Sequence, residues 1–375
     1  MRRTASRRRS IEKERNTMAM TGAMSAAISG MKNHMQALNV VGNNIANVNT
    51  YGYKTQRITF KESIYNTLSA GSGGTATMGS TNPRQIGYGC TVGTIDLDMN
   101  PGDLVSTGRD LDCTIKGDGF FLVGSKDVDI ESADDVKGLN LTRVGDFEFR
   151  DGYLTDGQGN VVYGYLISSV TNPAENDGDP GTTIGDVSTA LVPIRLPMKS
   201  TNEDTLGSAV YVGVDADGKN VDPTEDVDGY IDYSNLSIDA NGKIVCTNEN
   251  TKEEVVVGYI ALATVDNQGG VLHTDGPYYN AGDAAGDITL SAPNSAVTGY
   301  LNNGRIEGED GEIDPDTMLL AGSTTGLMTA FLEGSGTDLA TEFSNMIIYQ
   351  RGYQANTRII TVTDSMLEEL VNMKR

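Results

Sequence analysis

Apolar residues recur every three or four positions near both ends of the chain, which is the spacing of one face of an α-helix. The pattern runs from Met24 to about Val48, and again from about Asp338 to Lys374. The N-terminal stripe consists of Met24, Ile28, Met31, Met35, Leu38, Val41 and Ile45. The C-terminal stripe consists of Leu339, Phe343, Met346, Tyr353, Ile360, Leu367 and Val371. The pattern therefore predicts a long amphipathic helix at each end.

Local signals place the ends of these helices. Gly42 and the Asn-rich stretch up to Gly52 disfavour helix, so the first helix should stop there. Thr337 or Asp338 can cap the start of the second. With roughly 35 residues, that helix would be about three times the average length. We therefore expect the helices to pair as a coiled coil, with each other or with neighbouring subunits, rather than pack on a globular core.

Between the helices the pattern changes to short alternating runs separated by Gly-rich turns, which is typical of β-strands. Asp112–Lys116 and Phe120–Val123 are predicted to form one hairpin, and Phe147–Arg150 and Tyr153–Thr155 a second. Further strands are predicted at 161–167, 209–214, 243–246 and 255–263. The predicted fold class is therefore multidomain and mainly β, with long terminal α-helices pairing as a coiled coil and β-rich middle domains.

The amino-acid composition argues against several classes of function. The chain has 375 residues, 28 basic and 51 acidic, and a formal net charge of −23. This acidity argues against nucleic-acid binding, because affinity for phosphates depends on clustered Lys and Arg. No apolar run is long enough to span a bilayer, so we expect no membrane insertion. With two His, three Cys and no catalytic motif, we expect no enzyme and no cofactor.

The segment before Met18 is rich in arginine, and no apolar stretch follows it to complete a secretory signal. We expect residues 1–17 to be a disordered basic extension. Translation starting at Met18 or Met20 is favoured over an arm that binds nucleic acid or membrane.

One acidic segment partly matches a calcium-binding loop, with Asp226, Asp228 and Asp232 as ligands. Thr224 stands where the first aspartate is required, and Asn235 where the bidentate glutamate is required. Losing both carboxylates should remove most of the affinity. A solvated Asp-Gly hairpin is therefore favoured, and the three aspartates are a weak metal-site candidate.

Several motifs occur in a fixed order along the chain. They span residues 28–31, 42–54, 82–87, 116–121, 342–356 and 370–375. On these motifs the chain resembles bacterial flagellar rod and hook proteins, and its C-terminal end resembles the hook protein more than the rod subunits. The signature residues are Ser29, Gly30, Met31, Gly42, Asn43, Asn44, Asn47, Asn49, Thr50, Gly52, Tyr53, Lys54, Phe343, Met346, Gln350, Arg351, Gly352, Tyr353 and Asn356.

The resemblance implies a structural role. Family members pair their terminal helices into an inner-tube domain and assemble helically into a curved, flexible tube that joins rod to filament. The implied partners are further copies of the chain, the distal rod, the hook cap and hook–filament junction proteins, and the flagellar type III export apparatus. The implied location is the extracellular hook at the cell surface.

The resemblance also suggests how the chain divides. The expected parts are the extension 1–17, the N-terminal helix and connector 18–75, a discontinuous β-rich core domain 76–165 and 234–330, an inserted acidic outer β domain 166–233, and the C-terminal helix 331–375. Two other functions stay open. A distal-rod subunit is the alternative within the family, and a secreted β-rich calcium-binding or adhesive surface protein is the alternative of another class.

Overall fold

The computed structural model describes residues 2–74, 78–126, 130, 133–169, 186–187, 191–211, 227–293 and 325–372. The chain forms two compact units. The terminal unit comprises residues 1–48, 54–98 and 337–375, and the central unit comprises residues 49–53 and 99–336. Each unit has its own secondary structure and core, so each is described separately.

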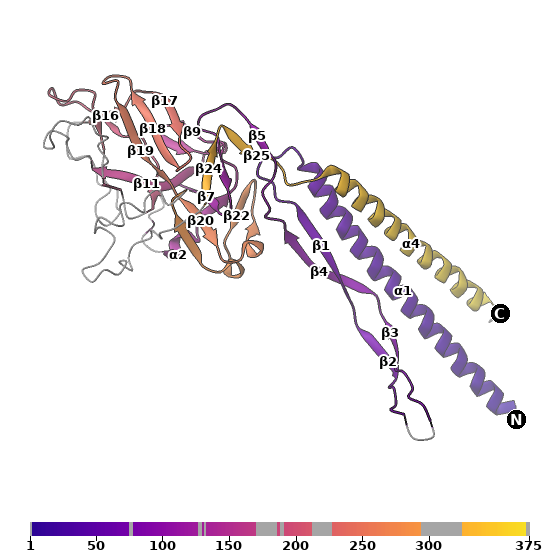
Figure 1. The fold of residues 1–375 in the computed structure, drawn as a ribbon. Coiled ribbons are helices and arrows are strands. Elements are labelled where there is room, and N and C mark those ends of the chain that lie inside the picture. Colours follow the sequence, from indigo (N-terminus) through magenta and orange to yellow (C-terminus); the bar gives the residue numbers. More distant parts are fainter. Residues whose placement is uncertain are drawn as a thin grey trace. The chain divides into compact units, whose positions relative to one another are not determined.

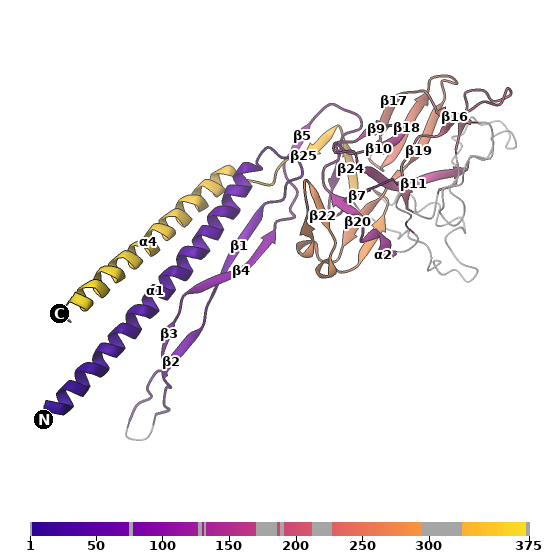
Figure 2. The same ribbon diagram turned by 180° about the vertical axis from the view of Figure 1, so that it is seen from behind.

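The terminal unit consists of α-helices α1 (Arg2–Ala46) and α4 (Leu339–Asn372) and a long β-hairpin. The hairpin is formed by the antiparallel pairs β1 (Gln56–Glu62) with β4 (Cys90–Leu97) and β2 (Tyr65–Ser69) with β3 (Arg84–Gly87). Figures 1 and 2 show the two helices side by side with both chain termini at the same end, so the helices are antiparallel.

Both predicted helices are present. α1 ends at Ala46 within the Asn-rich stretch, and α4 begins at Leu339, directly after the predicted cap Asp338. The Ala340 N–H donates a hydrogen bond to Asp338 Oδ1 at 3.0 Å, which confirms that cap. A hydrogen bond from the Thr341 hydroxyl has the largest effect on the pKa of Asp338, and together with the bond from Ala340 N–H it lowers that pKa below its ordinary value.

The expectation that residues 1–17 are disordered is wrong, because α1 already begins at Arg2. The segment is rich in Arg, Lys and Glu, which are good helix formers. It also extends a helix that tertiary contacts hold further along, so no new nucleus has to form.

The hairpin differs from the expected division of the chain. The sequence places residues 76–98 with the core domain, whereas in the structure strands β3 and β4 pair with β2 and β1 in the terminal unit. The stretch between β2 and β3, expected to be an extended connector, continues the hairpin through a bridge between Ser72 and Thr81. Half of the predicted acidic outer domain, 166–233, lies outside the described residues.

The central unit contains an antiparallel sheet in which 14 described strands take part. Its main strand order is β17-β18-β19-β11-β7-β8-β22-β21. Those strands are β7 (Phe120–Gly124), β8 (Asn140–Thr142), β11 (Val161–Ser169), β17 (Tyr233–Ile238), β18 (Lys243–Asn248), β19 (Glu254–Ile260), β21 (Leu272–His273) and β22 (Tyr278–Asn280). Joined to this path are β9 (Glu148–Arg150), β10 (Tyr153–Thr155), β12 (Asp186–Val187), β13 (Val192–Pro193), β20 (Leu262–Val265) and β23 (Ile288–Ser291).

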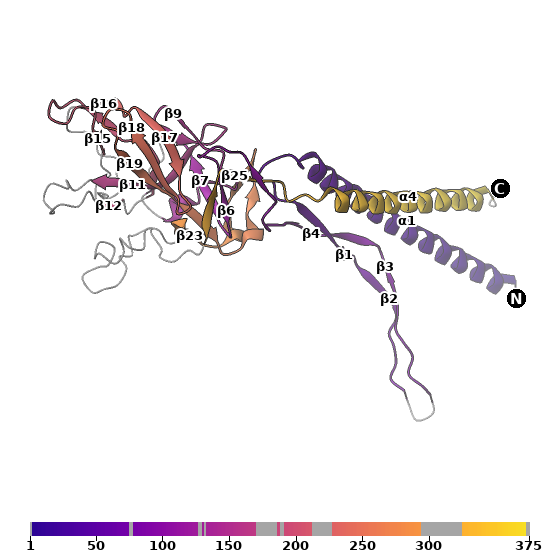
Figure 3. The same cartoon turned by 45° about the horizontal axis from the view of Figure 1, so that its top comes forward.

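Smaller pairings complete the central unit (Figure 3). The strands β14 (Met198–Ser200), β15 (Ala209–Val210) and β16 (Val227–Tyr230) form a separate sheet. The pairs β5 (Leu104–Ser106) with β25 (Phe331–Glu333) and β6 (Cys113–Lys116) with β24 (Gly326–Thr329) join distant parts of the chain. Short helices are α2 (Ala133–Val136), η2 (Gln268–Gly270) and η3 (Asp283–Ala285).

One predicted hairpin is confirmed and the other is wrong. β9 pairs with β10 across Asp151-Gly152, whose φ angles of 51° and 82° suit a two-residue hairpin turn. β6 and β7 do not pair with each other, because β6 pairs with β24 and β7 pairs with β8, β11 and β20. All of β7 is buried, so neighbours from distant parts of the chain decided its pairing.

A buried ion pair ties remote segments of the central unit together. Arg143 Nη1 lies 3.8 Å from Glu333 Oε2, and the two side chains are 0% and 2% exposed. Glu333 accepts hydrogen bonds from Gly52 N–H at its backbone oxygen (2.8 Å) and from Gly102 N–H at Oε1 (2.9 Å). Arg143 donates to Gly117 O and lies over the Phe120 ring. This charged pair therefore connects its own two strand regions with three other stretches of backbone, at Gly52, Gly102 and Gly117.

We expect Glu333→Ala to lower the free energy of unfolding of the central unit by about 3–5 kcal/mol, because it leaves a buried guanidinium without its counter-charge. Chemical denaturation followed by tyrosine fluorescence measures this loss. The exposed Glu254 provides a matched control, and its change to alanine should stay within about 0.5 kcal/mol of wild type. Equal midpoints for the two variants would contradict the role of the pair.

Candidate functional site

The terminal helices approach closely at two glycines. A Cβ atom at Gly352 of α4 would lie 2.5 Å from His34 Nε2 of α1. A Cβ atom at Gly30 of α1 would lie 2.8 Å from Asn356 Nδ2 of α4. Real Cβ contacts are not that short, so the helices keep this separation only with glycine at both positions. At both positions a side chain of one helix therefore packs directly against a glycine of the other.

Small and polar residues, rather than the predicted apolar stripe, occupy the most buried face of α1. That face consists of Ala27, Gly30, Asn33, Ala37, Val40, Val41 and Asn44. Of the predicted stripe only Val41 is buried, and Met35 is 49% exposed. The reason is geometric, because this face lies against both α4 and the β1–β4 strands and large side chains would hold the three elements apart.

An aromatic cluster marks the point where the three elements meet. The His34 ring lies 5.8 Å from the Phe60 ring of β1 and 6.1 Å from the Tyr349 ring of α4. His34 Nδ1 is buried and has no hydrogen-bond partner among the described residues. Burial lowers the pKa of His34 below its ordinary value and raises that of Tyr349. The helix pairing therefore favours neutral histidine.

Asparagine side chains supply hydrogen bonds on the same face of α1. Asn44 accepts from Gln56 N–H at 3.1 Å and donates to Gln56 O at 2.9 Å, which joins the end of α1 to the start of β1. Asn33 Nδ2 lies 3.1 Å from Cys90 Sγ of β4. Burial raises the pKa of Glu342, and a hydrogen bond with Asn44 opposes that shift. These buried polar groups demand partners, so they fix how the helix and hairpin align.

The signature residues occupy three settings. Buried or half-buried in the terminal unit are Ser29, Gly30, Met31, Gly42, Asn44, Asn47, Lys54, Met346, Gly352, Tyr353 and Asn356. Exposed in the terminal unit are Asn43, Phe343, Gln350 and Arg351. In the central unit, Asn49 and Thr50 are exposed, whereas Gly52 and Tyr53 are buried. Four of the signature residues take part in the contacts described above. Gly30 lies against Asn356, Gly352 lies against His34, and Asn44 forms hydrogen bonds with Gln56.

Sequence reasoning missed His34 and Phe60 of the aromatic cluster. The spacing of Ala27, Gly30, Ala37 and Asn44, in steps of three and seven residues, was the available signal for a second, small-residue face. No local pattern indicates Phe60, because the hairpin brings it to the helices.

Large apolar side chains are exposed on the outer faces of the terminal unit. On α4, Ile347 and Ile348 are 59% and 61% exposed, and on the hairpin Ile64 and Met78 are 76% and 72% exposed. Others are Phe60, Tyr65, Leu68, Ile86, Tyr88, Ile95, Leu339, Phe343, Ile359, Val362, Met366 and Val371. Many exposed large apolar side chains on one unit are typical of a surface that contacts another protein or a membrane.

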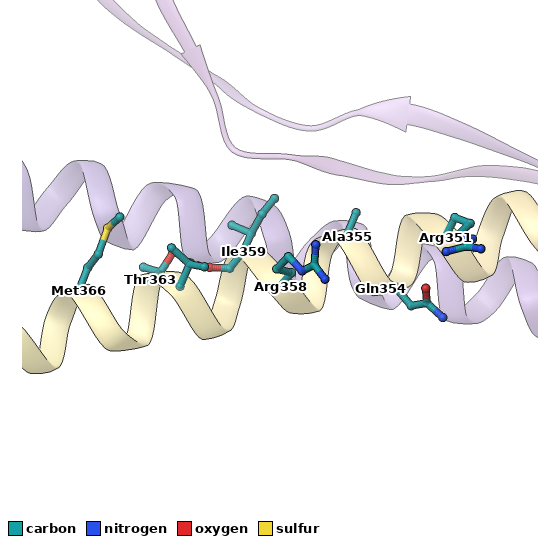
Figure 4. A pocket seen from close by; sticks show the side chains of 8 residues that line it. Arg351, Gln354, Ala355, Arg358, Ile359, Thr363 and Met366 are labelled. Atoms are coloured by element: carbon teal, nitrogen blue, oxygen red, sulfur yellow. The ribbon is translucent and has the colours of Figure 1, made fainter.

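A groove of about 630 Å³ runs along α4 (Figure 4). Its described lining consists of Arg351, Gln354, Ala355, Arg358, Ile359, Val362, Thr363 and Met366. It therefore combines two exposed arginines with partly exposed aliphatic side chains, a mixture that suits another protein surface better than a small molecule.

The weak calcium candidate gains no support where it can be followed. Asp232 accepts a hydrogen bond from Lys199 Nζ at 3.1 Å, and this contact lowers its pKa. Asp228 belongs to β16, which pairs with β14 through an irregular register, and Gly229 has a φ of 67° there. The expected Asp-Gly hairpin is therefore wrong, and Asp226 lies outside the described residues. Among the residues that the structure describes, no cluster of His, Cys, Asp and Glu could hold a metal ion.

No helix among the described residues combines the length and the apolar composition needed to span a membrane. The exposed apolar surface of the terminal unit is divided between a mixed helix face and the strands of a hairpin.

Comparison with known proteins matches both ends of the chain to family models. Residues 24–54 match the model of flagella basal body rod proteins, and residues 328–373 match that of the C-terminal region of the flagellar basal body rod proteins FlgEFG. The chain is 32% identical to the flagellar basal-body rod protein FlgG of Bacillus subtilis, over 95% of this chain and all of that protein. It is 25% identical to the flagellar hook protein FlgE of Borreliella burgdorferi, over 95% and 100%. The hook protein FlgE of Salmonella typhimurium is also 25% identical, over 94% and 100%.

We expect Gly352→Ala to weaken the α1–α4 pairing by about 1–3 kcal/mol, because the added methyl group collides with His34. Gly42→Ala is the matched control, since a Cβ atom there meets nothing within 4 Å. That control should stabilise α1 by roughly 1 kcal/mol through helix propensity. Thermal unfolding followed by helical circular dichroism measures both, and stabilisation by Gly352→Ala would contradict the close approach.

We expect acidification from pH 7 to about 5 to weaken the helix pairing through His34. Its pKa is lowered in the folded unit, so as pH falls through the ordinary value of about 6.5 the unfolded state takes up a proton that the folded state resists. Glu342 has a raised pKa and acts in the opposite direction. The difference in melting temperature between wild type and His34→Phe at each pH isolates the histidine. A difference that does not change with pH would refute this role.

Proposed function

The chain belongs to the family of flagellar rod and hook proteins, and from that membership we propose that it is a structural subunit of the flagellar hook. In this proposal many copies assemble helically into a curved, flexible tube that links rod to filament. The observation that carries the proposal is the arrangement of the terminal unit. Its helices meet through small and polar residues, whereas large apolar side chains on α4 and the hairpin are left exposed.

Assembly would cover that surface. Burying the exposed parts of about a dozen large apolar side chains would contribute on the order of 10 kcal/mol per subunit before ordering costs. A stable monomer gains nothing from leaving such side chains in water. Repeated contact with further copies explains why they extend along most of α4 and along the hairpin.

We further propose that α1 and α4 pair as a coiled coil. On α4 the half-buried or buried residues Glu342, Tyr349, Asn356, Thr363 and Leu370 follow one another at intervals of seven. This heptad spacing keeps one seam facing a partner helix along its whole length. The signature residues would then hold the inner-tube domain together, with the buried ones in the helix pair and the exposed ones toward neighbouring subunits.

The proposed partners follow from the same assignment. They are further copies of this chain, the distal rod, the hook cap and the hook–filament junction proteins. Export would proceed through the flagellar type III apparatus, and the assembled protein would lie outside the cell.

A distal-rod subunit is the second candidate. The 32% identity to a protein named as a rod protein favours it. Resemblance of the C-terminal motifs to hook proteins and the acidic segment 166–233 favour the hook, because a rod enclosed by rings leaves little room for an outer domain. A calcium-binding or adhesive surface protein has less support, since Asp232 is already paired with Lys199.

Polymerisation of the purified full chain, followed by sedimentation and electron microscopy, tests the proposal. We expect tubes that curve, because a hook must bend while it rotates. Straight, rigid tubes under the same conditions would indicate the rod subunit instead. A monomer whose terminal helices resist protease and which forms no tube at any concentration would refute both assignments.

A further inference from the structure

Two arginines of the α4 groove have no ion-pair partner among the described residues. Arg351 and Arg358 are exposed and seven residues apart, so they lie on the same edge of the helix. Beside them the groove presents Ile359, Val362 and Met366, which are 46%, 46% and 51% exposed. In a chain with a net charge of −23, two cations without a described ion-pair partner, beside apolar side chains, form a distinct positive site.

The complementary charge lies further along the same helix. Asp364 and Glu368 are exposed, four residues apart, and have no described ion-pair partner. At 100° per residue, the edge they share lies about 110° around α4 from the edge of the arginines. Its midpoint lies about 11 to 12 residues further along, or about 17 Å at 1.5 Å per residue. The helix therefore carries a basic edge and an acidic edge that face different directions around the helix axis and lie at different positions along it.

We propose that the α4 groove of one copy receives the Asp364–Glu368 edge of α4 from a neighbouring copy, with the two helices parallel and displaced by about 17 Å along their axes. The partner is thus a second copy of this chain. The inference rests on the proposed self-assembly and adds a register to it.

The geometry suits continuous growth. An interface between two different edges is heterologous, so each copy that binds with one edge still offers the other edge to the next copy. Edges that face neighbours in directions less than 180° apart close into a curved wall rather than a flat row. The apolar groove residues supply contact area, while the charges select one displacement among the many that a uniform apolar helix would allow.

Charge reversal on each edge tests the register. The basic-edge variant is R351E/R358E and the acidic-edge variant is D364K/E368K, each in the full chain. Alone, each variant places like charges together, and we expect its critical concentration for polymerisation to rise roughly tenfold or more. Mixed in equal amounts, the two variants restore opposite charges wherever a copy of one contacts a copy of the other, so the mixture should polymerise like wild type with the two variants alternating. A chain that carries all four substitutions should also polymerise like wild type.

The control matches the change in net charge. Lys126 and Lys252 are exposed in the central unit, and K126E/K252E alters the charge as much as the basic-edge variant does. This control should polymerise as wild type does. Helical circular dichroism of each variant, measured in the mixture as well as alone, separates loss of helix from loss of contact.

Two results would overturn the register. One is polymerisation of either single-edge variant at the critical concentration of wild type, and the other is failure of the mixture and of the fourfold variant. In both cases wild-type tubes would still support the proposed function. Failure of wild type itself to polymerise would remove the proposed function and the register together.

Discussion

The close approach of α1 and α4 is the constraint on which the terminal unit depends. Glycine at positions 30 and 352 leaves room for the Asn356 and His34 side chains of the opposite helix, and most other residues on the buried face of α1 are small or polar. Apart from Tyr349 and Leu370, few large apolar side chains enter this seam, and many others on α4 and the hairpin are exposed. The same constraint that stabilises the helix pair therefore creates the surface available to other subunits.

The central unit depends on a different kind of contact. Its strands are short, and a sheet made of short strands depends on pairings between segments that are far apart in the chain. The Arg143–Glu333 pair contributes here because a buried charge requires both a counter-charge and hydrogen-bond donors at fixed positions. Buried polar groups select one arrangement of these segments where apolar packing alone would accept several.

Apolar area and charge have separate roles in the assembly that we propose. Apolar contact is not directional and would hold parallel helices at many displacements with similar affinity. Charged edges at different heights make one displacement better than the rest. A tube that bends needs both kinds of contact. The apolar contacts tolerate small shifts between neighbouring subunits, and the charged contacts favour the return of each subunit to one displacement.

The amino-acid pattern alone predicted the two helices, the cap at Asp338, the mainly β middle and the family, because periodicity, capping and short motifs are local properties. It failed where partners come from far away in the chain. The pairing of β6 with β24, the place of His34 beside Phe60 and the choice of a small-residue face on α1 all depend on segments dozens to hundreds of residues apart. An apolar stripe shows that a helix has a face to cover, but only the tertiary structure decides whether that face is covered within the chain or left for a neighbour, since this depends on how closely the backbones can approach.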